Sequence, residues 1–480
     1  MEKPKRLVCV SNRISLPRRS AAAGGLAVGL LSALRHTGGT WFGWSGETVE
    51  KPSSEPEIVT RDNIRFATID LCSSNFEQYY NGYCNSTLWP LFHYFPQRFA
   101  HEQSYFDAYQ AVNERFANAL VRVIGADDTV WVHDYHLIPL ARQLRRLKFT
   151  GRIGFFLHIP FPHAQILRLL PHYGQIVRDL CEYDLLGFQT EDDVSSFMSC
   201  LELALPGGWS HSGDGVEVDG RAVRLGAYPI SVDVEDIAQK ASAAVAEEAL
   251  QRLTASLLGR KLIIGIDRLD YSKGLIERVA AFEHFLETFP GSQGKVTFLQ
   301  IAPLSRADVL AYGEIRTALE GMAGRLNGRF AEADWTPIRY LNRNFSHAMT
   351  MGYLRASHVA LVTPVRDGMN LVAKEYVAAQ DPEDPGVLLL SPMAGAAREL
   401  TGALQVNPYD RAGMALALQT ALHMPLADRR RRHQKMLDAL RRNDIHHWYT
   451  RFLRDLGGVA PAPPATRRRN SSQTARRGDV

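Results

Sequence analysis

The stretch HVALVTPVRDGMNLVAKE, residues 358–375, runs from a continuous apolar segment directly into a helical pattern. A segment that is apolar at successive positions is typical of a strand buried on both faces, as in a parallel sheet covered by helices. Asn370 is suited to cap the helix that we expect to begin at Leu371. A cap explains neither Asp367 nor Glu375, and ligands of such sheets bind at the carboxyl ends of the strands. The stretch therefore predicts an α/β fold with a ligand site at this junction.

Comparable apolar segments alternate with amphipathic ones along the chain, in two series. The expected strands of the first series are RLVCVS (6–11), IRFATID (64–70), TVWVHD (129–134), RIGFFLHI (152–159), LLGFQT (185–190) and VRLGAYPI (223–230). Those of the second are KLIIGIDRL (261–269), KVTFLQIAP (295–303), IRYLN (338–342), HVALVTP (358–364) and GVLLLS (386–391). Expected helices include 106–124, 191–205, 274–289, 307–326 and 411–422, and an Ala-rich helical stretch at 231–260 separates the series. This alternation predicts two doubly wound, Rossmann-like domains.

Length and composition agree with a two-domain globular protein. The chain has 480 residues, more than one hydrophobic core usually serves. Hydrophobic residues make up 45% and charged residues 22%, which is ordinary for a globular chain. No apolar run is long enough for a membrane span, and the first apolar segment is too short for a signal peptide. We therefore expect a cytoplasmic protein with no membrane partner.

The formal net charge of +4 resides in the last residues. The segment 458–480 contains five arginines and one aspartate among Pro, Ala and Ser, so we expect a disordered basic tail. Residues 1–457 then carry no net charge, which argues against a nucleic-acid partner. The five cysteines are widely spaced without a C-x-x-C pair, which predicts reduced thiols rather than disulfides or a zinc site.

Polar strings recur where the expected strands end. They are SNR (11–13), HDYH (133–136), HIPFP (158–162), DRLDYSKG (267–274) and RDGMN (366–370). Each string alone is explained as well by a helix cap, an ion pair or a satisfied buried polar group. Together they lie at the one edge of a parallel sheet where α/β sites form, which favours a functional site.

Charge and glycine patterns indicate an anionic ligand. Backbone N–H groups of Gly24 and Gly25 can approach an anion closely, but their loop lacks the G-x-G-x-x-G spacing, which argues against a dinucleotide dehydrogenase. Arg268 and Lys273 beside a helix start suit a leaving diphosphate, although an ion pair with Asp270 explains them too. No His, Asp or Glu cluster has metal-ligand spacing, so we predict neither a metal nor a cofactor.

Two further features suit a sugar. A carboxylate such as Asp367 can accept two hydrogen bonds from sugar hydroxyls. The aromatic residues Tyr80 and Trp89 either pack in the core or form a wall for the apolar face of a sugar ring. Glu375 lies beyond the capping positions of its helix, and the alternative for it is a solvent-facing or ion-paired side chain.

Taken together, the strings resemble one family, the retaining trehalose-6-phosphate synthases, which have the two-domain GT-B fold. The resemblance covers about residues 6–456 and rests on VSNR, AGGLAVGL, WFGWSGE, LWPLFHY, WVHDYHL, FFLHIPFP, DLLGFQTE, RLDYSKGL, QIAPLSR, LVTPVRDGMNLVAKEYVAAQ and NPYD. It implies transfer of glucose from UDP-glucose to glucose 6-phosphate, which gives α,α-trehalose 6-phosphate and UDP. The segments 95–106 and 205–222 match no family motif.

The resemblance also implies roles for individual residues. The catalytic residues it implies are His158, Arg268, Lys273 and Asp367. The donor-binding residues are Gly24, Gly25, Arg268, Lys273, Phe345, Asp367, Gly368, Met369, Asn370, Leu371, Val372, Ala373, Lys374 and Glu375. The acceptor-binding residues are Arg13, Tyr80, Trp89, Asp134 and Arg306.

The implied domains are an N-terminal acceptor domain (1–232), a C-terminal nucleotide-sugar domain (233–443), a helix that returns to the first domain (444–457) and the tail (458–480). The implied partners are the two small-molecule substrates, and a homo-oligomer is compatible with the resemblance. Because no phosphatase domain follows residue 457, a separate trehalose-phosphate phosphatase is expected downstream. We also expect the two domains to close on the donor.

Two alternatives stay open at this point. A sister synthase that uses glycerol 3-phosphate would share the donor motifs, and the acceptor residues Tyr80, Trp89, Asp134 and Arg306 favour glucose 6-phosphate over it. A catalytically silent regulatory relative would lack donor contacts, and all those named are present in the sequence. The motifs do not discriminate between UDP, GDP and ADP as the nucleotide of the donor.

Overall fold

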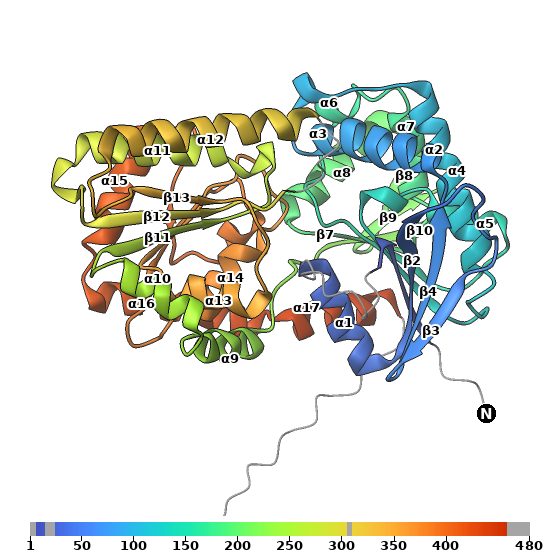
Figure 1. The fold of residues 1–480 in the computed structure, drawn as a ribbon. Coiled ribbons are helices and arrows are strands. Elements are labelled where there is room, and N and C mark those ends of the chain that lie inside the picture. The colour runs from blue at the N-terminus through green and yellow to red at the C-terminus, as the bar shows by residue number, and fades with distance from the viewer. Residues whose placement is uncertain (1–5, 15–24, 305–309, 458–480) are drawn as a thin grey trace, which may run out of the picture.

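Two sheets organise the computed structural model, which describes residues 6–14, 25–304 and 310–457. Figure 1 shows them side by side, and helices cover both faces of each. We call the part around the first sheet the N-terminal lobe and the part around the second the C-terminal lobe. The predicted pair of doubly wound α/β units is confirmed. The tail, 458–480, lies outside the described residues.

The N-terminal lobe is built on a mostly parallel sheet. Its strands are β1 (Leu7–Arg13), β2 (Gly39–Thr48), β3 (Glu57–Arg61), β4 (Ile64–Leu71), β5 (Thr129–His133), β6 (Ile153–Phe156), β7 (Leu185–Phe188), β8 (Trp209–Ser212), β9 (Gly215–Val218) and β10 (Arg221–Ala227). Their order is β3-β4-β2-β1-β5-β6-β7-β10-β9-β8, with antiparallel pairs only at the two edges. The helical segments are α1 (Gly25–Thr37), α2 (Ser73–Asn75), η1 (Phe76–Leu88), α3 (Trp89–Phe92), η2 (Pro96–Arg98), α4 (Gln103–Leu120), η3 (Tyr135–Leu137), α5 (Leu140–Arg146), α6 (Ala164–Leu167), α7 (Tyr173–Leu180) and α8 (Glu191–Ala204).

The C-terminal lobe contains a fully parallel sheet. Its strands are β11 (Lys261–Ile266), β12 (Val296–Ile301), β13 (Ile338–Leu341), β14 (Val359–Val362), β15 (Val387–Leu390) and β16 (Leu404–Gln405), in the order β13-β12-β11-β14-β15-β16. The helical segments from residue 234 onward are α9 (Val234–Ala244), α10 (Glu248–Ser256), η4 (Tyr271–Lys273), α11 (Leu275–Thr288), η5 (Pro290–Ser292), α12 (Leu310–Phe330), α13 (His347–Ala356), α14 (Leu371–Ala379), η6 (Gly395–Arg398), α15 (Arg411–Leu422), α16 (Leu426–Arg442) and α17 (Ile445–Leu456).

Burial on both faces explains the continuous apolar strands. Along β1, Val8 and Val10 belong to the core that contains residues of α4 and α5, whereas Leu7 and Cys9 belong to the core that contains residues of α1 and α17. Successive side chains of a strand point to opposite faces, so a sheet covered on both sides needs apolar residues at every position.

Helix α17 covers the N-terminal lobe although it follows the C-terminal lobe in the chain (Figure 1). The ring centroid of Phe452 lies 4.7 Å from that of Trp131 on β5, in a stacked arrangement, and that of Trp448 lies 5.0 Å from it. Within the described residues, α17 therefore completes the hydrophobic core of the first sheet.

All strands and helices expected from the sequence are present, but some strands were not predicted. These are β2, β3, β8, β9 and β16. The segment 205–222 forms the β8-β9 pair and the turn into β10, where Asp219 and Gly220 both have positive φ, as a tight hairpin turn requires. Short edge strands with polar or glycine-rich sequences carry too little apolar alternation to be recognised. Of the helices that the structure describes, none is long and apolar enough to cross a membrane.

Candidate active site

A cleft of about 590 Å³ has walls from both lobes, at the carboxyl ends of their strands. The predicted site residues that line it are Arg13, Tyr80, Trp89, Asp134, His158, Arg268, Lys273, Asp367, Met369, Asn370, Leu371, Val372 and Glu375. Residues far apart in sequence thus meet in one place, where the topology of parallel sheets predicts a ligand site.

The N-terminal wall combines a cation with aromatic rings. The guanidinium carbon of Arg13 lies 5.6 Å from the ring centroid of Trp44. The ring of Tyr80 stacks on that of His136 at 5.9 Å. Tyr80 belongs to η1, a π-helix, which is a local distortion common at functional sites. This wall offers flat apolar faces and positive charge, which suits a phosphorylated sugar.

Two neutral histidines lie at the base of this wall. Nδ1 of His133 lies 3.2 Å from Nε2 of His158, a hydrogen bond that needs one donor and one acceptor. Burial lowers the pKa of His158 to about 3 and that of His133 well below its usual value. Both rings are therefore uncharged at neutral pH and provide hydrogen bonds rather than charge.

Asp134 holds a strained backbone beside these histidines. Its φ is 76°, and its Oδ1 accepts a hydrogen bond from the backbone N–H of His158 at 3.3 Å. Asn370 on the opposite lobe also has positive φ, at 72°. Non-glycine residues in this region are uncommon and concentrate at binding sites, so both positions fit a functional role.

On the C-terminal wall, Lys273 and Asp367 form an ion pair with Nζ and Oδ2 2.5 Å apart. Asn370 donates from Nδ2 to the same Oδ2 at 3.1 Å, and its own Oδ1 accepts from the backbone N–H of Ala373. Asn370 therefore caps α14, as predicted, and also fixes the carboxylate that precedes it.

A buried ion pair supports this wall from behind. The fully buried Arg278 places Nη2 2.7 Å from Oδ2 of Asp267, and its Nε donates to the hydroxyl of Thr363 at 3.0 Å. Burial raises the pKa of Asp267, and the adjacent Arg278 opposes that shift. These contacts join the ends of β11 and β14, so they hold the segments that carry Lys273 and Asp367.

The two lobes meet closely at the cleft. The guanidinium carbon of Arg268 lies 6.0 Å from the ring centroid of Trp89 across the lobes. A Cβ atom added to Gly368 would lie 2.5 Å from the backbone oxygen of His158. Glycine is therefore required where the turn after β14 approaches the N-terminal lobe.

Other predicted residues lie elsewhere. Phe345 does not line the cleft, and its ring packs against Tyr353 with centroids 5.2 Å apart. Lys374, predicted to bind the donor, is instead fully buried: its Nζ donates to the backbone oxygen of Ile230 at 2.8 Å and pairs with Glu399. That prediction is corrected for its side chain.

The remaining predicted positions are glycines, an alanine and an arginine. Ala373 is buried beside Lys374, and Gly368 contacts the other lobe as described above. Gly25 is the first residue of α1. Gly24 and Arg306 lie outside the described residues.

The cleft also contains residues that we did not single out. They are Ser11, Asn12, His93, His133, Tyr135, His136, Ile159, Gln189, Ile230 and Asp267. Most of them belong to strings that had marked the strand ends, so proximity to those strings was the available indication. In the described ranges, no group of three or more His, Cys, Asp or Glu side chains is arranged to hold a metal ion.

Known proteins resemble the chain over nearly its full length. The family model "Glycosyltransferase family 20" matches residues 7–457. A trehalose-6-phosphate synthase of Cronobacter sakazakii (strain ATCC BAA-894) is 50% identical over 471 residues, which cover 98% of each chain. A crystal structure of the UDP-forming α,α-trehalose-phosphate synthase from Burkholderia xenovorans in complex with glucose-6-phosphate has a TM-score of 0.91 at 49% identity, and covers 94% of this chain and 100% of that one. An E. coli structure bound with UDP-2-fluoro glucose has a TM-score of 0.91 at 48% identity, with 95% and 100% covered. The expected GT-B architecture is confirmed by these matches.

Proposed function

The chain belongs to glycosyltransferase family 20, and on this premise we propose that it is a retaining glucosyltransferase that transfers glucose from UDP-glucose to glucose 6-phosphate. The products are α,α-trehalose 6-phosphate and UDP. The observation that carries the proposal is a single cleft in which Arg268, Lys273 and Asp367 of one lobe face Arg13 and Trp89 of the other. Relatives of about the same identity are structures with glucose-6-phosphate and with UDP-2-fluoro glucose.

The C-terminal wall is the donor side in this proposal. Arg268 and Lys273 balance the charge of the diphosphate, and Asp367 accepts hydrogen bonds from the transferred glucose. Glu375, whose Oε1 lies 3.7 Å from Nε2 of His347, accepts the ribose hydroxyls. The side chain of Lys374 has no part in this site because it is buried against Glu399.

The N-terminal wall is the acceptor side. Arg13 binds the phosphate of glucose 6-phosphate, while Tyr80 and Trp89 face the sugar ring. Asp134 orients the acceptor, and the uncharged His158 contributes a hydrogen bond to the transferred sugar. Glycerol 3-phosphate has no ring to fill the space beside these aromatic residues, so the wall favours a hexose phosphate.

Retention of configuration follows from front-face transfer between the two walls. The bond from C1 of glucose to the phosphate oxygen breaks, and the acceptor hydroxyl forms the new bond to C1 on the same face. The departing phosphate oxygen takes the proton of that hydroxyl, so charge and protons balance. Positioning and charge stabilisation by the protein then supply most of the rate enhancement.

Closure of the lobes on the donor is part of the proposal. Contacts across the lobes support it: the guanidinium carbon of Arg366 lies 4.2 Å from the ring centroid of Tyr94, and the rings of Phe95 and Tyr271 lie 4.8 Å apart. Closure excludes water, which would otherwise compete with the acceptor.

The test is an assay of UDP release by the purified protein. UDP-glucose, GDP-glucose and ADP-glucose are each combined with glucose 6-phosphate or with glycerol 3-phosphate. We expect turnover with UDP-glucose and glucose 6-phosphate and a product with two α-anomeric protons in its NMR spectrum. Turnover only with glycerol 3-phosphate would support the sister synthase instead, and no turnover in folded protein would favour a regulatory relative.

The setting of the reaction is also proposed. All five cysteines are free thiols, as expected in the reducing cytoplasm, where we place the enzyme. A separate trehalose-phosphate phosphatase is expected to consume the product. Analytical ultracentrifugation tests the suggested homo-oligomer.

A further inference from the structure

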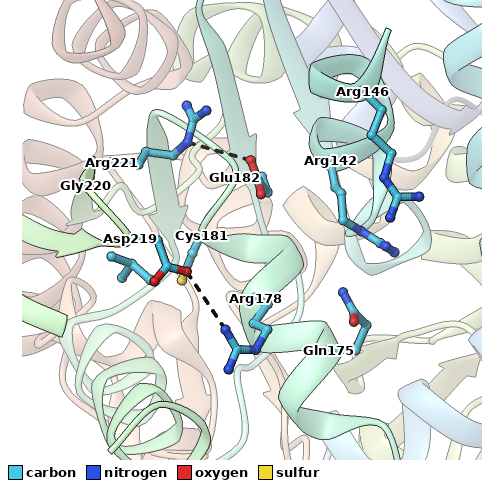
Figure 2. A pocket seen from close by; sticks show the side chains of 10 residues that line it. Arg142, Arg146, Gln175, Arg178, Cys181, Glu182, Asp219, Gly220 and Arg221 are labelled. Atoms are coloured by element: carbon cyan, nitrogen blue, oxygen red, sulfur yellow. Dashed lines mark ion pairs between the residues drawn. The ribbon is translucent and has the colours of Figure 1, made fainter. Parts of the chain in front are cut away.

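A second hollow, of about 640 Å³, lies in the N-terminal lobe and shares no lining residue with the cleft. Figure 2 shows Arg142 and Arg146 of α5 on one side of it, and Arg178 of α7 and Arg221 of β10 on the other sides. Four guanidinium groups from three separate elements therefore surround one space. The proposed transfer reaction uses none of them.

The carboxylates at the walls do not neutralise this charge. Glu182 and Asp219 are the acidic residues that line the hollow. Arg178 lies 3.9 Å from Asp219, and Arg221 lies 3.7 Å from Glu182, distances at the long end for ion pairs. The Arg178 and Asp219 side chains are 53% and 82% exposed, so water screens their attraction strongly.

Arg146 adds a cation without an acidic partner. Among the described residues its recorded contact is with Oε1 of Gln143, at 3.5 Å, and no carboxylate lies within 4.0 Å of it. A neutral amide oxygen at this distance compensates little of the charge of a guanidinium. The hollow therefore has positive charge available for an anion.

Arg142 is held rigidly for the same purpose. Its Nε lies 2.6 Å from Oδ1 of the fully buried Asp179, and its Nη2 donates to Oε1 of Gln110 at 2.5 Å. Gln175 in turn donates to Asp179 at 2.7 Å. The Arg142 side chain retains 19% exposure, toward the hollow that it lines. A guanidinium fixed from behind loses little entropy when it binds an oxyanion.

We propose that this hollow binds a small polyanion that carries two phosphate groups. Guanidinium groups bind phosphate oxygens in a bidentate manner, and here they stand on opposing walls rather than converging on one point. The volume greatly exceeds that of one phosphate ion, which also favours a ligand with two. Inorganic diphosphate and bisphosphorylated metabolites share this chemistry.

Two covalent and hydrogen-bonded connections link the hollow to the acceptor wall. Helix α5 begins directly after η3, whose residues Tyr135 and His136 line the cleft. Tyr183 follows Glu182 in the chain, and its hydroxyl donates to the backbone oxygen of Leu137 at 2.8 Å. We therefore expect binding in the hollow to change the KM for the acceptor more than that for the donor, a consequence that rests on the proposed function.

Isothermal titration with sodium diphosphate tests the site, with UDP and glucose 6-phosphate in excess to occupy the cleft. We expect one binding event whose Kd rises about tenfold or more in Arg146→Gln, since one charge-assisted contact is lost. The matched control is Arg168→Gln, an exposed arginine of the same lobe that does not line the hollow. Absence of the binding event, or an equal Kd in Arg146→Gln, would overturn the proposal.

Two further measurements separate the possible failures. Arg146→Lys keeps the charge but not the bidentate geometry, so an intermediate Kd supports phosphate binding and covers the case in which the Gln variant is unstable. Diphosphate should shift the KM for glucose 6-phosphate at least about twofold in the parent but not in Arg146→Gln. An equal shift in both would place the ion in the cleft and count against the site. Binding in a protein without turnover would contradict the proposed function alone.

Discussion

Nζ of Lys273 lies 2.5 Å from Oδ2 of Asp367, although the two residues belong to segments that follow β11 and β14. These strands are neighbours in the sheet, which explains why the residues meet. Each side chain is only 11% exposed. In the proposed reaction the ammonium faces the diphosphate and the carboxylate faces the sugar, so one ion pair joins the two halves of the donor site.

Replacing either partner should abolish most of the transfer. We expect Lys273→Ala and Asp367→Ala each to lower kcat/KM by about two orders of magnitude or more, because charge stabilisation of the leaving group or positioning of the glucose is lost. UDP release measures the effect, and circular dichroism checks the fold. Lys435→Ala, an exposed lysine of α16, is the control. Parental rates in folded Lys273→Ala would refute the role of this cation.

Removing the buried Arg278 should destabilise the C-terminal lobe. Arg278→Ala leaves Asp267 buried without its partner, and we expect a loss of about 3–5 kcal/mol in the free energy of unfolding. Urea denaturation measures it. The control Arg325→Ala removes a 59% exposed arginine that lies 3.5 Å from Glu283, and it should cost about 1 kcal/mol or less. Equal losses in the two variants would contradict a structural role for the buried pair.

Acid should destabilise the fold through its buried histidines. Burial lowers the pKa of His93 to about 4 and that of His158 to about 3. Below pH 6.5 the unfolded chain binds protons that the folded chain does not, so stability falls as the pH falls from 6.5 toward these values. The loss between pH 6.5 and 5 is at most about 2 kcal/mol for each histidine.

His93→Gln isolates this effect, because glutamine can still donate a hydrogen bond to the backbone oxygen of Trp89. Urea denaturation at several pH values should show a shallower loss of stability in this variant. Buried carboxylates with raised pKa, such as Asp179, have the opposite slope and are common to both proteins. Identical slopes in parent and variant would mean that His93 titrates normally.

A side chain at Gly368 should separate the lobes. Because the new Cβ of Gly368→Ala would lie 2.5 Å from the backbone oxygen of His158, we expect kcat/KM to fall about tenfold or more. Gly328→Ala in α12, where the added Cβ meets no atom within 4 Å, is the control. The same assay of UDP release applies, and an unchanged rate in folded Gly368→Ala would show that the lobes adjust to the extra atom.

Sequence periodicity was enough to find the site-bearing strands but not the edges of the sheet. The strands β1, β11 and β14 are short, apolar at nearly every position and buried on both faces, so their sequences are distinctive. The β8-β9 pair is polar and exposed, and its pairing depends on the neighbouring β10, which no local pattern records.

The orientation of side chains on α14 shows the same limit. With 3.6 residues per turn, Leu371, Val372 and Glu375 fall on one side of the helix, and these line the cleft. Ala373 and Lys374 fall on the other side, and both are buried. The periodicity was present in the sequence, but which side faced the ligand depended on how the helix packs.

By itself, the sequence determined two α/β units and the polar strings at their strand ends, because the periodicity and position of residues are properties of the chain. Only the tertiary structure decided that Arg278 balances Asp267, that Lys374 pairs with Glu399, and that four arginines surround a second hollow. Partners that are distant in sequence and chosen by packing leave no mark on local pattern, since charge alone does not specify which opposite charge it meets.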